Sequence, residues 1–311
     1  EIKFSSYAEV WQAWNKLLKF YTDLAVESDH ICDNSLKKHD ADPFASSLIN
    51  NSIDRGKTLK NGGGEFDFVS QSNIGTSIIG DALAVIKKLV FEDKVITFRE
   101  LRNALDANWD GEENQKIRKV ALAVPKFGND EDYVDELVAD VYTSYLDILP
   151  DYHNERFGKG PVGCGYTMST SNISSYVPSG MDVGATPDGR YAGDPLNEGA
   201  SPCLGADKLG PTAVAKSVSK LPNKRMAGGQ LLNMKFAPGV MEGDDNLDKF
   251  ISFIEANRVL GNFHMQFNIV DSDELRDAKA HPERHQDLMV RVAGYCALFT
   301  SLIPPVQDAI I

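Results

Sequence analysis

The first part of the chain repeats apolar residues at spacings of three and four. Between Tyr7 and Cys32 this spacing predicts a long helix buried along one face, because such positions share one side of a 3.6-residue turn. Two tryptophans in the stripe are expected to be core side chains rather than a cofactor site. The residues of the stripe are Val10, Trp11, Trp14, Leu17, Leu18, Tyr21, Leu24 and Ala25.

A glycine-rich stretch follows, with three glycines at positions 62–64. Neither GxxxxGK[ST] nor GxGxxG follows a strand there, so a phosphate-binding loop is disfavoured. The pattern instead predicts a turn, a short strand over Phe66–Val69 and a helix over Thr76–Phe91.

Two further helices have clear local signals. Thr97 stands three residues before Glu100, which is the spacing of a capping box at a helix start. The sequence "DEDYVDELVADVYTSYLDIL" predicts another helix, whose acidic face we expect to be solvated. Its apolar stripe consists of Val134, Leu137, Val141, Tyr145 and Ile148.

The amino-acid composition changes between Phe157 and Pro238, where Gly, Pro, Ser and Asn are frequent. Aromatic and β-branched residues persist there, so we predict short strands joined by ordered turns rather than a disordered linker. Long ordered loops of this kind often carry function.

The last third alternates strands and helices. Leu231–Phe236 and Phe263–Val270 are predicted strands that flank a helix over Asn246–Arg258, which is a β-α-β pattern. A short helix over Asp273–Ala280 then leads to "VRVAGYCALF" at residues 290–299. The fold class predicted from these elements is α/β.

Composition and charge restrict the function. The 311 residues carry a formal charge of −13, which argues against a nucleic-acid partner because such binding depends on clustered Lys and Arg. No stretch is long and apolar enough to cross a membrane, and the first residues lack the features of a signal peptide. We expect a cytoplasmic protein.

Common catalytic and metal motifs are missing. Cys32, Cys164, Cys203 and Cys296 are widely spaced, which indicates reduced thiols rather than a zinc site or disulfides. His281 and His285 lack a matching carboxylate pattern, so we predict no metal site.

Three charged residues in and next to "GRYAGDP" are interpreted as structural rather than catalytic. Asp188, Arg190 and Asp194 lie in a turn-rich segment, where an Arg and Asp pair that holds a loop is expected. No GxSxG elbow and no Cys with an evident base partner occurs.

One glycine, Gly294, stands inside the apolar run at 290–299. A glycine in a strand-like run costs backbone entropy and usually marks a bulge or the close approach of another backbone. This structural interpretation is the simplest one for the residue.

A second interpretation comes from six blocks of sequence. The end of the chain, "VRVAGYCALFTSLIPPVQDAII", resembles the radical-bearing motif of the glycyl radical enzymes, a pyruvate formate-lyase-like superfamily. Further similar blocks are "PKFGNDEDYVDELV", "GATPDGRYAGDPL", "GPTAVAKSVSKL", "GGQLLNMKF" and "GNFHMQFNIV", so the resemblance covers nearly the whole chain. The residues that match the end motif are Arg291, Val292, Gly294, Tyr295, Phe299, Leu302, Gln307, Ile310 and Ile311.

The resemblance implies that Gly294 stores a radical on its α-carbon. A planar radical centre between two peptide groups tolerates no side chain, and the apolar flanks would shield it from water and oxygen. Arg291, Val292 and Tyr295 would support the loop, and Gln266, Asn268, Asn172, Ile173 and Ser174 are candidate pocket residues. No bound cofactor is expected, because a separate iron–sulfur activating enzyme that uses S-adenosylmethionine installs the radical.

The resemblance also implies that the chain is a fragment. None of its cysteines matches the position of the family's thiyl cysteine, which faces the glycine from another loop, so we place that cysteine upstream of Glu1. We expect the second half of an α/β barrel with surrounding helices and the glycine radical loop, inactive on its own. The expected parts of this single fragment are a mainly helical part over 1–156, a loop- and strand-rich barrel part over 157–270 and a truncated glycine radical domain over 271–311.

Several reactions remain open within the resemblance. The leading expectation is radical addition of a hydrocarbon to fumarate, as in alkylsuccinate and benzylsuccinate synthases. The alternatives are dehydration of a diol-type substrate, decarboxylation of an arylacetate, and an inactive paralogue or structural partner. Expected partners are the activating enzyme, a small-molecule substrate and other subunits, in a homodimer or a hetero-oligomer with small subunits.

Overall fold

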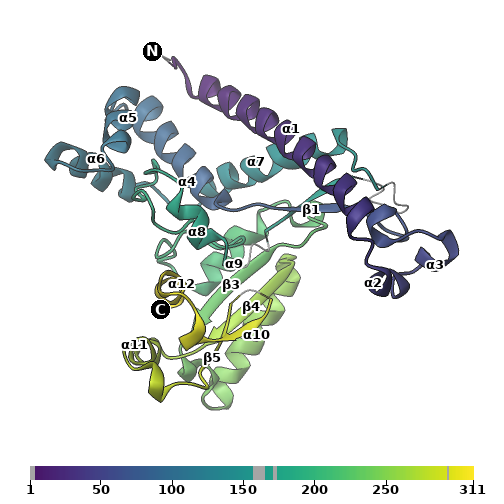
Figure 1. The fold of residues 1–311 in the computed structure, drawn as a ribbon. Coiled ribbons are helices and arrows are strands. Elements are labelled where there is room, and N and C mark those ends of the chain that lie inside the picture. The colour runs from purple at the N-terminus through teal and green to yellow at the C-terminus, as the bar shows by residue number, and fades with distance from the viewer. Residues whose placement is uncertain (1–3, 157–164, 171–173, 293) are drawn as a thin grey trace. The chain divides into compact units, whose positions relative to one another are not determined.

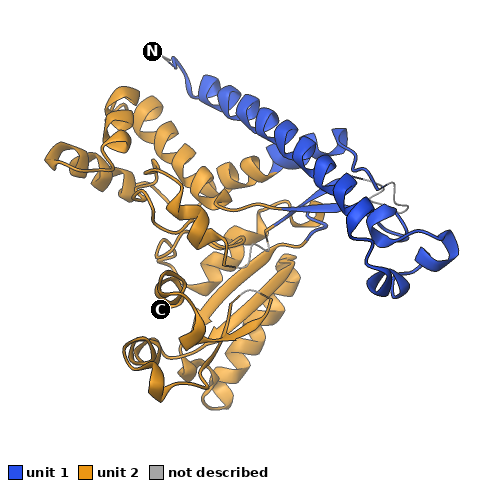
Figure 2. Ribbon diagram, viewed as in Figure 1, with its two compact units in different colours: residues 1–71, 143–169, 226–228 blue, residues 72–142, 170–225, 229–311 orange. Residues whose placement is uncertain are grey.

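The computed structural model describes residues 4–156, 165–170, 174–292 and 294–311, which form two compact units (Figure 2). Unit 1 draws on residues 1–71, 143–169 and 226–228, and unit 2 on residues 72–142, 170–225 and 229–311. Each unit joins segments that are far apart in the sequence, so long-range contacts hold each one together.

Unit 1 is built on one long helix, α1 (Tyr7–His39), which is labelled in Figure 1. The indole Nε1 of Trp14 donates to Ser144 Oγ at 3.2 Å, and the Tyr166 hydroxyl donates to Asp29 at 2.7 Å, so both ends of the helix are attached to residues beyond position 143. Its elements are α1 (Tyr7–His39), α2 (Pro43–Ser47), α3 (Ser52–Arg55), η1 (Leu59–Asn61), η3 (Leu149–Asp151) and the strand pair β1 (Val69–Ser72) and β2 (Tyr166–Ser169).

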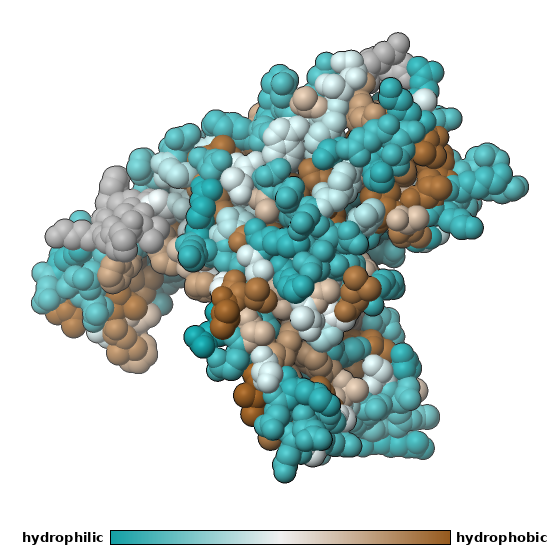
Figure 3. Space-filling view, turned by 180° about the vertical axis from the view of Figure 1, so that it is seen from behind, coloured by the Kyte–Doolittle hydropathy of each residue, from teal (hydrophilic) through white to brown (hydrophobic). Residues whose placement is uncertain are grey.

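Helix α1 confirms the predicted helix and extends it by two turns. The prediction that its apolar stripe is buried is wrong in part, because Leu17, Tyr21 and Leu24 are 55, 64 and 48% exposed. The buried residues of the helix include Thr22, whose hydroxyl donates to the Leu18 carbonyl, and Asp33, which pairs with Arg156 at 3.5 Å. Apolar patches of this kind are visible at the surface among polar side chains (Figure 3).

Within the described residues, no helix is long and apolar enough to cross a membrane.

Unit 2 begins with helices. The predicted helix over 76–91 is confirmed as α4 (Thr76–Val85) continued by the π-helical η2 (Ile86–Glu92). The capping box is confirmed, since the Thr97 N–H donates to Glu100 at 2.7 Å and the Glu100 N–H donates to Thr97 Oγ1 at 3.2 Å. The further helices are α5 (Phe98–Asp106), α6 (Glu112–Ala123) and α7 (Asp132–Ile148), the last of which ends in unit 1.

Two predictions of short strands are wrong. The strand expected at 66–69 lies three residues later, as β1, and the residues at 62–68 are a mixture of turn, bend and irregular backbone. In the described part of 157–238 before residue 231, β2 is the one strand, and helices α8 (Tyr176–Met181), α9 (Pro211–Ser219) and η4 (Asn223–Arg225) follow it. Pro211 starts α9 at a position where its missing N–H costs nothing.

The predicted β-α-β unit is confirmed. Strands β3 (Leu231–Phe236) and β4 (His264–Ile269) pair in parallel, with Asn233 opposite Gln266, and α10 (Asp244–Leu260) connects them. η5 (Pro238–Met241) lies between β3 and α10. Phe250 of α10 packs edge to face on Phe236 and Phe267, with ring centroids 5.6 and 5.0 Å apart. This face is therefore apolar, and residues alternate along β4, so Gln266 and Asn268 lie on the opposite face.

A short hairpin closes the chain. Strands β5 (Met289–Arg291) and β6 (Cys296–Leu298) are antiparallel, and Val290 and Phe299 are buried against Leu275 of α11 (Ser272–Ala280). The remaining elements are η6 (Pro282–Arg284), η7 (Phe299–Ser301) and α12 (Pro304–Ile310). The apolar run at 290–299 is thus two strands and a turn.

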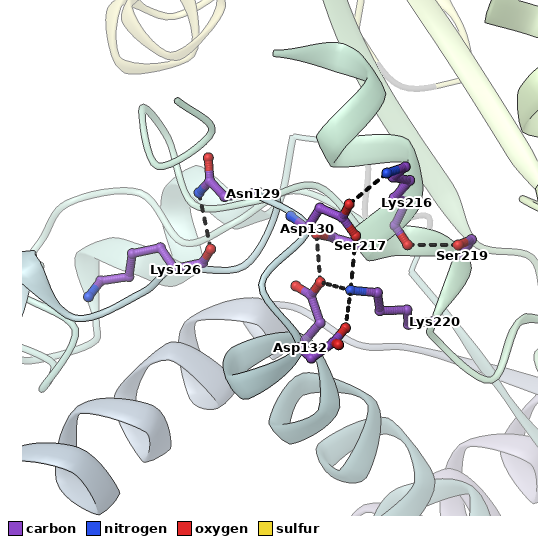
Figure 4. Close-up of polar contacts among 9 residues, drawn as sticks. Lys126, Asn129, Asp130, Asp132, Lys216, Ser217, Ser219 and Lys220 are labelled. Carbon is purple, nitrogen blue, oxygen red and sulfur yellow. Dashed lines mark hydrogen bonds and ion pairs between the residues drawn. The ribbon is translucent and has the colours of Figure 1, made fainter. Parts of the chain in front are cut away.

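A cluster of ion pairs joins the start of α7 to α9 (Figure 4). The Lys220 ammonium lies 3.1 Å from Asp130, 2.6 Å from Asp132 and 2.8 Å from Asp135. The Ser217 hydroxyl also donates to Asp135 at 2.9 Å. Asp135 is fully buried, so Lys220 compensates a carboxylate that has left water.

Replacing Lys220 by Met is expected to lower the free energy of unfolding by about 3 kcal/mol, because it leaves Asp135 buried without a cation. Lys216→Met provides the matched control, since Lys216 binds only the partly exposed Asp130 and is itself half exposed. That change is expected to cost less than about 1 kcal/mol. Urea unfolding of both variants measures the difference, and equal losses would contradict the assignment.

Candidate functional site

Gly294 occupies the turn of the β5–β6 hairpin. Its φ is +76°, and the Val292 N–H donates to the Tyr295 carbonyl at 2.9 Å across the turn. Apart from its chain neighbours, no atom of the described residues lies within 4 Å of where a Cβ of Gly294 would stand, so these residues make no close approach of another backbone. The backbone reason for glycine here is the left-handed conformation alone.

Two amide side chains of β4 hold this hairpin. Asn268 binds both backbone groups of Arg291, accepting from its N–H and donating to its carbonyl, each at 2.7 Å. Gln266 Oε1 accepts from the Gly294 N–H at 2.9 Å and from the Arg291 Nε at 2.8 Å. Gln266 and Asn268, predicted as pocket residues, are therefore also contacts of the hairpin itself.

The three residues expected to support the loop have different environments. Arg291 is tied to both β4 amides, and Val292 is 8% exposed in the apolar cluster under the hairpin. Tyr295 closes the turn through its carbonyl, while its side chain is 43% exposed. Gly294 is exposed too, so the shielding expected from its apolar flanks stays a prediction for the full-length protein.

The cysteines near and far from the hairpin differ in chemistry. Cys296 is exposed on β6, and its sulfur lies 3.6 Å from an Arg291 guanidinium nitrogen. The Cys203 thiol donates to Asp81 at 3.3 Å, and desolvation raises its pKa well above the usual value. Cys203 is therefore held as a neutral thiol. Cys164 lies outside the described residues.

A cavity of about 600 Å³ borders the hairpin at Asn268, Arg291 and Val292. Glu198 lines its wall and accepts a hydrogen bond from the Asn233 amide of β3. Desolvation raises the pKa of Glu198 to about 7, so its carboxyl can hold or release a proton near neutral pH. Sequence reasoning missed Glu198 and Asn233, since neither belongs to a motif with its own chemistry.

A second cavity, of about 620 Å³, is lined by Asp81, Asp188 and Arg190. Arg190 donates to the carbonyls of Val183, Gly184 and Asp194, so it holds the loop as predicted, but through backbone carbonyls and not through the expected pair with an Asp carboxylate. Asp194 contributes by accepting from the Tyr191 N–H at 3.3 Å.

The remaining candidate residues from the sequence have other surroundings than the hairpin turn. Ser174 accepts from the Val177 N–H at 3.2 Å at the start of α8, while Asn172 and Ile173 lie outside the described residues. His285 pairs with Asp277 at 2.7 Å and His281 with Glu283 at 3.8 Å. Among the described residues, no group of three or more His, Cys, Asp and Glu side chains could hold a metal ion.

The hairpin with a glycine at its turn, docked on a parallel strand pair, lies inside the part of the chain that matches a family model. Residues 1–180 match the pyruvate formate lyase-like family and residues 196–300 match the glycine radical domain. The chain belongs to the pyruvate formate lyase-like family of glycyl radical enzymes, as its sequence blocks suggest.

Known proteins similar to the chain include dehydratases and sulfite-lyases. It is 44% identical over 313 residues to a probable dehydratase, YbiW, of Escherichia coli K12, and 36% identical over 310 residues to the trans-4-hydroxy-L-proline dehydratase of Clostridioides difficile. Each match covers 99% of this chain and 38% of the relative. A structure that describes 1,2-propanediol dehydration in Roseburia inulinivorans has a TM-score of 0.94 at 39% identity, over 99% of this chain and 39% of that one.

These matches support the predicted fold, the later part of a glycyl-radical-enzyme α/β barrel with surrounding helices. The chain spans somewhat over a third of the length of these relatives.

The raised pKa of Asp81, in the wall of the second cavity, predicts how the stability of the fold depends on pH. Asp81 is fully buried, accepts from the Phe127 N–H at 2.8 Å, and has a pKa that desolvation raises to about 7. A pKa that is higher in the folded state stabilises the fold at low pH. This stabilisation is lost as the pH rises from about 4 to about 7.

The free energy of unfolding is therefore expected to fall over that range by up to about 4 kcal/mol, at about 1.4 kcal/mol per pKa unit. Asp81→Asn removes the titrating group and should remove this part of the slope. Urea unfolding at a series of pH values measures both proteins, and parallel pH profiles would contradict the role of Asp81.

Proposed function

We propose that this chain is the glycine-radical-bearing part of a glycyl radical dehydratase, with the radical stored on Gly294. The observation that carries the proposal is the hairpin itself. Gly294 lies at its turn inside the matched glycine radical domain, and a buried amide of β4 binds its N–H. Arg291, Val292 and Tyr295 support the turn, as described above.

The chemistry consists of moving one hydrogen atom and returning it. In the activated enzyme Gly294 lacks one of its two α-hydrogens, and it takes a hydrogen atom from a cysteine thiol on a facing loop. The resulting thiyl takes a hydrogen atom from a substrate carbon next to a hydroxyl group, and water leaves. The product regains that hydrogen atom, so the reaction needs no external oxidant.

Dehydration is the reaction named for the two relatives and the structure described above. The relatives named above are described as dehydratases, which supports the diol-type alternative rather than the leading expectation of addition to fumarate. Loss of a hydroxyl group needs a proton donor. Glu198, in the cavity beside the hairpin and with a pKa of about 7, is one candidate for handling such a proton.

The proposal includes partners. An iron–sulfur enzyme that uses S-adenosylmethionine would remove one α-hydrogen of Gly294, in keeping with the glycine radical domain. The facing cysteine would come from the part of the full-length protein that corresponds to the additional length of the relatives. Assembly as a homodimer, or with small subunits, remains an expectation from the family.

The radical is tested by anaerobic activation of the full-length protein followed by electron paramagnetic resonance. We expect a glycine-centred doublet, which Gly294→Ala abolishes. Alanine at this positive φ costs only about 1–2 kcal/mol, so the variant should still fold. Exposure of the activated wild type to oxygen should cut the backbone at Gly294. Absence of the doublet in the wild type would instead favour an inactive paralogue.

The reaction is tested with the same activated protein and two substrate sets. A vicinal diol should lose water to give an aldehyde or ketone, and a hydrocarbon with fumarate should give no adduct. The Gly294→Ala variant serves as the control for both. Formation of a succinate adduct without dehydration would overturn the proposed reaction.

A further inference from the structure

We propose that Gln266 is a positioning residue for the radical centre, because its side-chain oxygen fixes the amide plane of Gly294 and enriches the electron density on its nitrogen. This inference rests on the proposed function, since it concerns the radical on Gly294. It adds a role for one buried side chain that does not itself exchange any atom.

The geometry makes Gln266 an acceptor for two donors at once. Its Oε1 receives the Gly294 N–H at 2.9 Å and the Arg291 Nε at 2.8 Å. Only oxygen can stand at this point, because a backbone N–H and a guanidinium N–H both donate and neither can accept. The orientation of the Gln266 amide is therefore determined by its partners.

Burial of Gln266 makes these two hydrogen bonds energetically important. Gln266 is 5% exposed, although the hairpin turn above it is exposed. Its Nε2 has no hydrogen-bond partner among the described residues, which is costly for a buried amide. The side chain is therefore held with its oxygen toward the hairpin at the expense of its nitrogen, as expected when the oxygen has the function.

The bond to Gly294 acts on the donor side of the radical. A radical on the α-carbon is stabilised by electron donation from the adjacent amide nitrogen, which requires that nitrogen to be coplanar with the radical orbital system. An N–H bound to a carbonyl oxygen in a buried environment is polarised, so its nitrogen becomes a better donor. Formation of the radical breaks one C–H bond of Gly294 and leaves the N–H and its bond to Gln266 intact.

Arg291 moderates this effect. Its guanidinium binds the same oxygen and withdraws electron density from it. At the same time its backbone is clamped by Asn268, so the shared oxygen, the guanidinium and the glycine nitrogen form one rigid group. Two neighbouring residues of one face of β4 thereby fix the position of the turn.

The first test needs no radical. In the unactivated full-length protein, Gln266→Met removes the acceptor at similar volume, and the Gly294 amide should then exchange its hydrogen about tenfold faster. Gln266→Glu keeps an oxygen acceptor and should retain the protection. The Val292 amide, bound to the Tyr295 carbonyl, reports on the hairpin and should keep its wild-type rate.

A matched control separates this role from the loss of any buried amide. Gln307 is 7% exposed and donates to the Phe299 carbonyl at 2.9 Å, below the same hairpin and without a bond to Gly294. Gln307→Met should leave Gly294 exchange unchanged. If Gln266→Met accelerates Val292 exchange as well, the hairpin has opened in that variant. The exchange rate of the Gly294 amide in Gln266→Glu then decides whether the side-chain oxygen protects Gly294. Loss of Gly294 protection in Gln266→Glu would then overturn the inference.

The second test uses the radical. After anaerobic activation, Gln266→Met should show more spin density on the α-carbon, seen as a wider doublet splitting, and a smaller hyperfine coupling to a ¹⁵N label at Gly294. Gln307→Met should give the wild-type line shape. Identical spectra for Gln266→Met and the wild type would overturn the inference. A wild type without any doublet would defeat the proposed function, whereas the exchange experiment would still decide whether Gln266 holds Gly294.

Discussion

The hairpin that carries Gly294 depends on one acceptor, the side-chain oxygen of Gln266, which two N–H groups share. The oxygen is available because residues along β4 alternate between two faces. Phe267 points to α10 and packs edge to face on Phe250, which leaves Gln266 and Asn268 on the other face. Packing on one side of the strand therefore determines which groups recognise the hairpin on the other side.

The neighbouring strand extends this arrangement to the cavity. Asn233 of β3 lies opposite Gln266 in the parallel register and donates to Glu198. Glu198 follows a loop that Arg190 holds through three backbone carbonyls. A buried arginine that binds carbonyls rather than carboxylates thus places an acid beside the hairpin, eight residues further along the chain. The position of that acid depends on loop geometry.

Local patterns predicted much of the fold but little of the site. The helix from Tyr7, the capping box at Thr97 and the β-α-β unit have repeating or short-range signals, and the structure contains them. The helix α9 was missed, since its Val, Thr and Ser residues suit strands and its stability comes from contacts such as Lys220 with Asp135. The buried stripe of α1 was mispredicted, because periodicity gives a face and says nothing about what covers it.

The candidate site shows the same limit. The end motif singled out Gly294 and Arg291 by resemblance, and the period of two in β4 places Gln266 and Asn268 on one face. Which groups that face binds depends on a contact between residues 28 positions apart, which no local pattern encodes. Glu198 could not be found either, since its raised pKa comes from burial in the folded chain.

The turn also distinguishes two reasons for a glycine. The backbone reason is the positive φ of Gly294, and it is a weak one, because a left-handed conformation costs an ordinary residue only about 1–2 kcal/mol. Crowding by the described residues adds nothing, since none of their atoms beyond the chain neighbours lies within 4 Å of a would-be Cβ. Asparagine, which adopts this conformation readily, would satisfy the hairpin equally well. The property that no other residue supplies is a Cα–H between two peptide groups without a side chain, which is what the proposed radical requires and what the bond from Gln266 holds in place.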